Sequence, residues 1–245
     1  MQQEVLLTID VDWSPDWMIE EVAAIFVAAG VKSTWFVTHA CPALDRLRRR
    51  SDLFELGIHP NCLPGSTHGR GETAVLTHMK AIVPEAVSMR SHGLYQTSAF
   101  LILAARAFGI RLESNILMPG APGIVPSDLR IDDIVMRRVP FFWADDLAMR
   151  DPQNTWRETD DVAYPPGLKV FAFHPFHVVM NANSYAHYES LKRERPLPQW
   201  TPDFVAPYRS AGIGAGAVLE ALVDRLAGRP TLFLKDLLDA EAAAA

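Results

Sequence analysis

Short apolar runs, rich in β-branched and aromatic residues, alternate along the chain with longer stretches in which apolar positions repeat at helical spacing. The short runs predict buried strands, and the longer stretches predict helices with one face against a sheet. Strands are expected at residues 4–10, 33–38, 54–59, 86–91, 111–115, 135–142, 168–173 and 231–234. Helices are expected at residues 15–29, 42–50, 71–82, 97–108 and 215–227. This alternation predicts an α/β fold with a largely parallel sheet and right-handed crossover connections.

Two long segments interrupt the alternation, at about residues 117–133 and 175–214. Both are rich in proline, glycine and aromatic residues and show no clear periodicity. Loops of this length in a compact domain are usually lids or binding loops, so we expect both to serve function. The chain shows no linker or internal repeat, and its 245 residues suit a single barrel domain over residues 1–245.

Composition narrows the class of partner. Hydrophobic residues make up 49% of the chain, enough for a sizeable core, and the net charge is −6. With no basic patch interleaved with aromatic residues, this charge argues against nucleic acid or an anionic membrane surface as the main partner. No apolar run is long enough to span a bilayer, and the N-terminal residues lack a signal-peptide pattern, so we expect a cytoplasmic protein. Two cysteines, Cys41 and Cys62, do not form a disulfide framework.

Paired carboxylates end the first predicted strand. Asp10 and Asp12 alternate along an extended chain, so both side chains should point to the same side. The carboxyl ends of parallel strands are where α/β folds place their chemistry. An aspartate in this position also commonly caps a following helix. However, two like charges this close at the end of a buried strand need a cation to keep both ionised.

Imidazoles and a guanidinium end three other strands. His59 follows the third strand, Arg90 the fourth, and His174 a strongly apolar late strand. Carboxylate and imidazole together suit a divalent metal such as zinc. Arg90 is either a surface ion-pair partner or a guanidinium that keeps Asp10 ionised. His174 is placed to act as a general acid, whereas His177, beyond a proline, should face a different direction.

In this order the motifs resemble the polysaccharide deacetylase family, the carbohydrate esterases with the NodB-type fold, over roughly residues 4–235. The single residue between the two aspartates and the sequence His-Pro-Asn at 59–61 are similar to the WbmS-like branch, which is associated with bacterial surface-polysaccharide biosynthesis. The resemblance implies a distorted (β/α) barrel of about seven strands, in agreement with the independent strand count. It also implies one divalent metal ion, expected to be zinc, and roles for five residues: Asp10 as catalytic base, Asp12 and His59 as metal ligands, Arg90 as the family arginine and His174 as general acid.

The chain departs from the family pattern at the third metal ligand. The family's second metal histidine stands four positions after the first, and that position here is Leu63. His68, in a loop with glycines and a proline, is the nearest substitute and the expected ligand, with His92 as the second candidate. The aromatic-proline part of the third motif is also replaced, by Ser-His-Gly at 91–93, so we expect an unusual substrate groove.

Several side chains are candidates for holding the substrate. Those predicted to bind it are Trp13, Asn61, His92 and His177. Aromatic residues that either stack on a sugar or belong to the core are Trp13, Trp143, Phe176 and Trp200.

The resemblance implies a metal-dependent hydrolase that removes an N-acetyl or O-acetyl group from a sugar, nucleotide sugar or oligosaccharide. One alternative is an inactive barrel that binds a sugar or metal, because fold does not fix function. Another is a different metal-dependent amide hydrolase, although the His-x-His signature of amidohydrolase barrels is absent from the first strand. A phosphate-binding loop is also absent, because the glycine-rich segment 212–216 lacks the following lysine.

Overall fold

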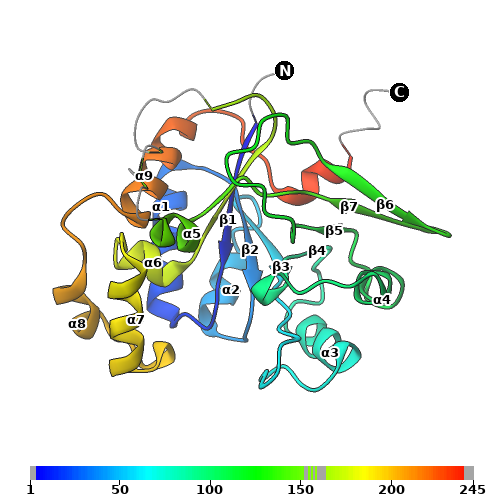
Figure 1. Ribbon diagram of the computed structural model, residues 1–245, viewed down its shortest axis with the longest axis horizontal. Coiled ribbons are helices and arrows are strands. Elements are labelled where there is room, and N and C mark those ends of the chain that lie inside the picture. Colours follow the sequence, from blue (N-terminus) through cyan, green and yellow to red (C-terminus); the bar gives the residue numbers. More distant parts are fainter. Residues whose placement is uncertain (1–3, 152–153, 155, 157, 159–163, 240–245) are drawn as a thin grey trace.

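The computed structural model describes residues 4–151, 154, 156, 158 and 164–239 (Figure 1). Nine strands lie within them: β1 (Val5–Asp10), β2 (Ser33–Val37), β3 (Phe54–Ile58), β4 (Ser88–Met89), β5 (Leu112–Glu113), β6 (Ser127–Ile131), β7 (Ile134–Arg138), β8 (Trp143–Ala144) and β9 (Lys169–Phe173). The α-helices are α1 (Asp16–Ala29), α2 (Pro42–Arg48), α3 (Glu72–Ile82), α4 (Ser98–Phe108), α5 (Asp145–Arg150), α6 (Pro175–Val179), α7 (Tyr185–Glu194), α8 (Pro202–Val205) and α9 (Ala215–Leu226).

The strands form one sheet in the order β6-β7-β5-β4-β3-β2-β1-β9-β8, parallel except for the β6–β7 pair. β1 lies inside the sheet, paired with β2 on one side and β9 on the other. All residues of β2, β3 and β9 are buried, as expected for parallel strands that are covered on both faces. The helices surround the strands, with α1, α6 and α9 in mutual contact on one side (Figure 1).

An extended segment that runs from β7 into β8 curls this sheet into a distorted barrel. Near its start, Val139 N–H donates to the Glu113 carbonyl at 2.8 Å, next to β5. Further along, Phe142 N–H donates to the Val170 carbonyl in β9, also at 2.8 Å. The segment is therefore hydrogen-bonded to β5 on one side and to β9 on the other. The predicted α/β class with a NodB-like barrel is confirmed.

The remaining differences concern irregular segments. The expected loop at 117–133 contains β6, whose partly exposed residues form a hairpin with β7 and so lack the apolar run of a core strand. The expected loop at 175–214 contains three α-helices, α6 to α8. The strand predicted at 231–234 is wrong, because residues Leu234–Leu238 form a 3₁₀ helix. Its first N–H groups bind side chains of β2 and β3 and do not pair with a strand. No helix of the described residues is long and apolar enough to cross a membrane.

Candidate active site

The two carboxylates at the end of β1 line the same cavity but have different partners. Asp10, the last residue of β1, is buried and accepts a hydrogen bond from Arg90 Nη1 at 2.9 Å. Asp12 lies beyond the strand in the left-handed region, at φ 43°, and Trp13 follows at φ 58°. The Trp13 N–H donates to Thr38 Oγ1 at 3.0 Å and fixes this turn. The turn therefore directs Asp12 away from Arg90 and toward a group of histidines.

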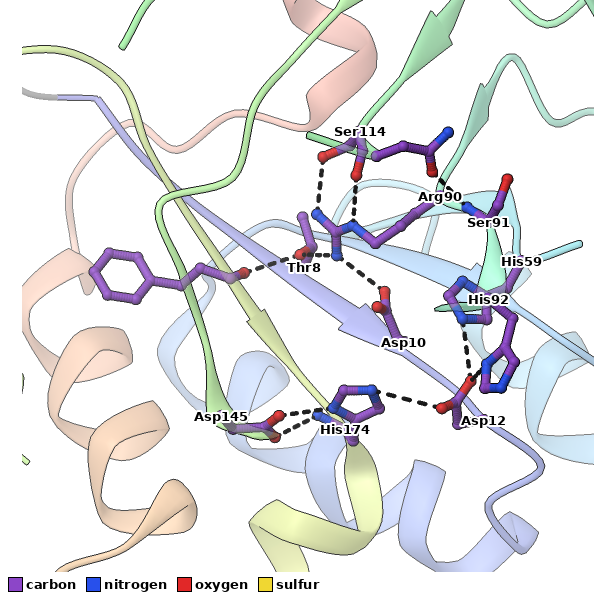
Figure 2. A network of polar contacts seen from close by, with 12 residues as sticks. Thr8, Asp10, Asp12, His59, Arg90, Ser91, His92, Ser114, Asp145 and His174 are labelled. Atoms are coloured by element: carbon purple, nitrogen blue, oxygen red, sulfur yellow. Dashed lines mark hydrogen bonds and ion pairs between the residues drawn. The ribbon is translucent and has the colours of Figure 1, made fainter. Parts of the chain in front are cut away.

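All three side-chain nitrogens of Arg90 are hydrogen-bonded, one of them to Asp10. Its Nη1 also donates to Thr8 Oγ1 at 2.8 Å, while Nε and Nη2 donate to the carbonyl and hydroxyl of Ser114, each at 2.9 Å (Figure 2). The guanidinium is 1% exposed and lies between two aromatic rings, those of Phe36 and Phe141. Arg90 is therefore a buried partner of Asp10 and not a surface ion pair.

Asp12 lies against three imidazoles (Figure 2). Its Oδ1 is 3.1 Å from His59 Nε2 and 3.0 Å from His92 Nδ1, and its Oδ2 is 3.6 Å from His174 Nε2. Burial alone would raise the pKa of Asp12, but hydrogen bonds to His59 and His92 and the charges of the imidazoles hold it well below its usual range. Burial lowers the pKa of His92, and the hydrogen bond and charge of Asp12 outweigh this and raise it. Asp12 is thus an ionised carboxylate in the middle of the site.

The donor atoms of Asp12, His59 and His92 suit a divalent metal. One ligand atom from each lies within 4.8 Å of the other two. In a tetrahedral zinc site with bonds of about 2.0–2.1 Å, neighbouring ligand atoms are about 3.3–3.5 Å apart, close to the spacing seen around Asp12. One carboxylate and two imidazoles also leave one position open for water or substrate, as catalytic zinc sites do.

The structure does not bring His68 into this group. Its Nδ1 accepts the Asn61 N–H at 3.1 Å, and its ring packs against His78 and Trp13. Burial, the largest cause, lowers the pKa of His68 to about 4, so the ring is neutral at ordinary pH. His92, the second candidate from the sequence, lies beside Asp12 instead.

His174 is held by a buried carboxylate that the sequence did not indicate. Asp145, the first residue of α5, accepts a hydrogen bond from the His174 N–H at 2.7 Å, and its other oxygen lies 2.7 Å from His174 Nδ1 (Figure 2). Burial lowers the pKa of His174, but the charge and hydrogen bond of Asp145 raise it well above its usual value. Asp145 directly follows the short strand β8, and a carboxylate after an apolar strand is the same signal that marked Asp10.

The remaining candidates line two adjoining cavities, of about 350 and 610 Å³, that share Asp12 and His92. Trp13 and Asn61 line the larger cavity, and His177 lines the smaller one. His177 is buried, with its Nδ1 3.2 Å from Asp145 Oδ2. Of the possible stacking residues, Phe176 lines both cavities. Trp143 and Trp200 are buried in the core and line neither cavity.

Comparisons with known proteins identify the family of this chain. The family model described as WbmS-like polysaccharide deacetylase matches residues 7–192. The chain is 35% identical to a Bordetella bronchiseptica protein described, provisionally, as a polysaccharide deacetylase involved in O-antigen biosynthesis; the match covers 90% of each chain at a TM-score of 0.78. The peptidoglycan deacetylase PdaC of Bacillus subtilis has a TM-score of 0.50 at 10% identity, over 99% of this chain and 93% of that one, which shows the shared fold alone. No curated protein matches the chain.

Proposed function

The chain belongs to the WbmS-like polysaccharide deacetylase family, and we propose that it is a metal-dependent hydrolase that removes an N-acetyl or O-acetyl group from a sugar in O-antigen biosynthesis. The observation that carries this proposal is the position of Asp12. It lies between Asp10, which is paired with Arg90, and His174, which is paired with Asp145. Asp10, Asp12 and His174 line one cavity.

The proposed metal ligands are Asp12, His59 and His92, with His92 in place of His68. A zinc ion held there would polarise the acetyl carbonyl and acidify a water molecule when bound. His68 supports the loop instead, because its Nδ1 is engaged by the Asn61 N–H and its ring lies against Trp13.

Asp10 is the proposed general base. It lines the cavity beside Asp12, and Arg90 holds its carboxylate in one orientation. A positioned carboxylate can take the proton from an attacking water and typically contributes about 10²–10⁴-fold to the rate.

His174 is the proposed general acid. Its Nδ1 faces Asp145, so its Nε2 points toward Asp12 and the cavity. Asp145 favours the protonated ring, which therefore holds a proton on Nε2 for the departing amine or alcohol.

Acetate release tests the proposal. Protein stripped of metal and reloaded with zinc should release acetate from N-acetylated sugar nucleotides or oligosaccharides, and the stripped protein should not. Asp10→Asn and His174→Ala should each lower kcat by about 10²-fold or more at unchanged zinc content. Near-native turnover by Asp10→Asn would refute the base assignment. If zinc-loaded protein releases acetate from none of these sugars, an inactive sugar-binding barrel becomes the better description.

A further inference from the structure

One wall of the smaller cavity is both aromatic and cationic. It is formed by α5 and α7, which contribute Arg150, Tyr185, Tyr188 and Lys192. Tyr188 and Lys192 also line the larger cavity, together with Asp12 and His92. This wall therefore lies in the same cavities as the proposed metal ligands.

Arg150 places a positive charge on this wall. It is the last residue of α5, and its guanidinium carbon lies 3.9 Å from the centre of the Tyr185 ring. Within the described residues it forms no ion pair with a carboxylate. A guanidinium that rests on an aromatic face keeps its N–H edge free for a carboxylate or phosphate, which it can bind through two parallel hydrogen bonds.

Lys192 adds a second positive charge on the same wall. Its Nζ lies 5.5 Å from the Tyr188 ring centre and 3.8 Å from Glu189 Oε1. The lysine side chain is 52% exposed, and an exposed pair of this kind contributes little free energy. The ammonium group can therefore leave Glu189 for a bound anion at small cost.

Of the three aspartates that line the cavity, one lies on the same wall as these cations. Asp10 is neutralised by Arg90, and Asp12 would face the metal. The acid left on the wall is Asp146, one turn before Arg150 in α5. Since the chain as a whole carries a net charge of −6, cations at this place do not reflect a general excess of basic residues.

We propose, on the basis of the proposed function, that the acetylated substrate is anionic and that Arg150 and Lys192 bind its acidic group while Tyr185 and Tyr188 contact the sugar. The acidic group is either the carboxylate of an acidic sugar or the diphosphate of a nucleotide sugar. Both are acceptors that guanidinium and ammonium groups recognise.

Equilibrium binding to the zinc-loaded full chain, in an Asp10→Asn background that slows turnover, tests this inference. The probes are neutral N-acetylglucosamine, its uronic acid, which carries a carboxylate, and UDP-N-acetylglucosamine, which carries a diphosphate. At least one anionic probe should bind about tenfold or more tightly than the neutral sugar. The preferred probe identifies the source of the anion.

Matched variants locate the effect on the wall. Arg150→Gln and Lys192→Gln should each weaken binding of the preferred anion about tenfold, with little change for the neutral sugar. Asp146→Asn should tighten anion binding. The control is Arg193→Gln, which removes an exposed cation of α7 that lies outside both cavities and should change neither affinity.

Equal affinity for neutral and anionic probes, equal effects of Arg150→Gln and Arg193→Gln, or no binding of any probe would overturn the inference. Acetate release from the same sugars by the wild-type protein is measured separately. A preserved anion preference without acetate release would refute the proposed function alone. Deacetylation without anion preference would refute the inference alone.

Discussion

Arg90 and Asp145 serve comparable purposes on opposite sides of the site, since each holds one proposed reacting group in place. All three side-chain nitrogens of Arg90 donate hydrogen bonds, so the guanidinium is fixed and holds the Asp10 carboxylate in one orientation. Asp145, fully buried at the start of α5, holds both the backbone N–H and the ring of His174. Buried charges are retained where they are paired and hydrogen-bonded, as both are here.

At the residue scale, Asp145→Asn tests this positioning role. The carboxylate raises the pKa of His174, so the neutral amide should let the imidazole lose its proton at lower pH. The alkaline limb of kcat/KM should therefore move to lower pH, and kcat should fall about 10²-fold or more, with zinc content unchanged. An alkaline limb that stays at the wild-type pH would show that Asp145 does not control the acid.

At the scale of elements, the 3₁₀ helix at Leu234–Leu238 closes the end of the barrel opposite the site. Its N–H groups at Leu234 and Lys235 donate to Thr34 Oγ1 and Glu55 Oε2, at 3.0 and 3.1 Å. Glu55 also accepts hydrogen bonds from Thr34 and Ser88. Thr34, Glu55 and Ser88 lie near the amino ends of their strands, where barrels keep residues that serve stability.

Glu55→Gln should make the folded state less sensitive to pH. Burial raises the pKa of Glu55, so between its ordinary value and the raised one the folded chain binds more protons than the unfolded chain. Wild-type stability should therefore fall as the pH rises through this window, because the buried carboxyl must ionise. The variant lacks this ionisable carboxyl, so its free energy of unfolding should not fall in the same window.

Urea unfolding at a series of pH values measures the effect. Below the ordinary glutamate pKa, the two proteins should differ in free energy of unfolding by about 1 kcal/mol or less. The amide oxygen can accept from Thr34 and Lys235, and the amide NH2 group can donate to the Ser88 hydroxyl, which then accepts. As the pH rises, the free energy of unfolding of Glu55→Gln should increase relative to that of the wild type. This change should stop above the raised pKa of Glu55. A difference that is constant across the series would contradict the argument.

The sequence predicted regular elements well where burial created a pattern. The helix expected at 15–29 is α1, which ends at Gly30 in the left-handed conformation. Prediction was poorer where chain segments are held by distant side chains. β6 is recognisable only through its pairing with β7, and residues Leu234–Leu238 only through their contacts with Thr34 and Glu55.

At the scale of the whole molecule, the proposed metal ligands join three separate parts of the chain. Asp12 follows β1, His59 follows β3, and His92 follows β4. The unfolded chain cannot hold them together, so a metal that binds them stabilises the folded state by mass action. At a free metal concentration of 100 times the dissociation constant, this stabilisation is about 2.7 kcal/mol.

Zinc should therefore raise the unfolding temperature by about 5–10 °C at that saturation, and a chelator should reverse the shift. His92→Ala should lose most of the shift, because it removes one of three ligands. His68→Ala, the matched histidine outside the group, should keep it. A shift lost in His68→Ala and kept in His92→Ala would restore His68 as the third ligand.

The amino-acid sequence by itself determined the alternation of strands and helices and the positions at which polar residues follow buried strands. This is why Asp10, Asp12, His59, Arg90 and His174 could be identified, since parallel strands bring their carboxyl ends to one edge. Only the tertiary structure decided which further side chains join them. His68 and His92 both lie beyond strand ends, and periodicity does not fix where such segments turn. The Asn61 N–H engages His68, while His92 reaches Asp12, and these contacts exist only once the strands are assembled.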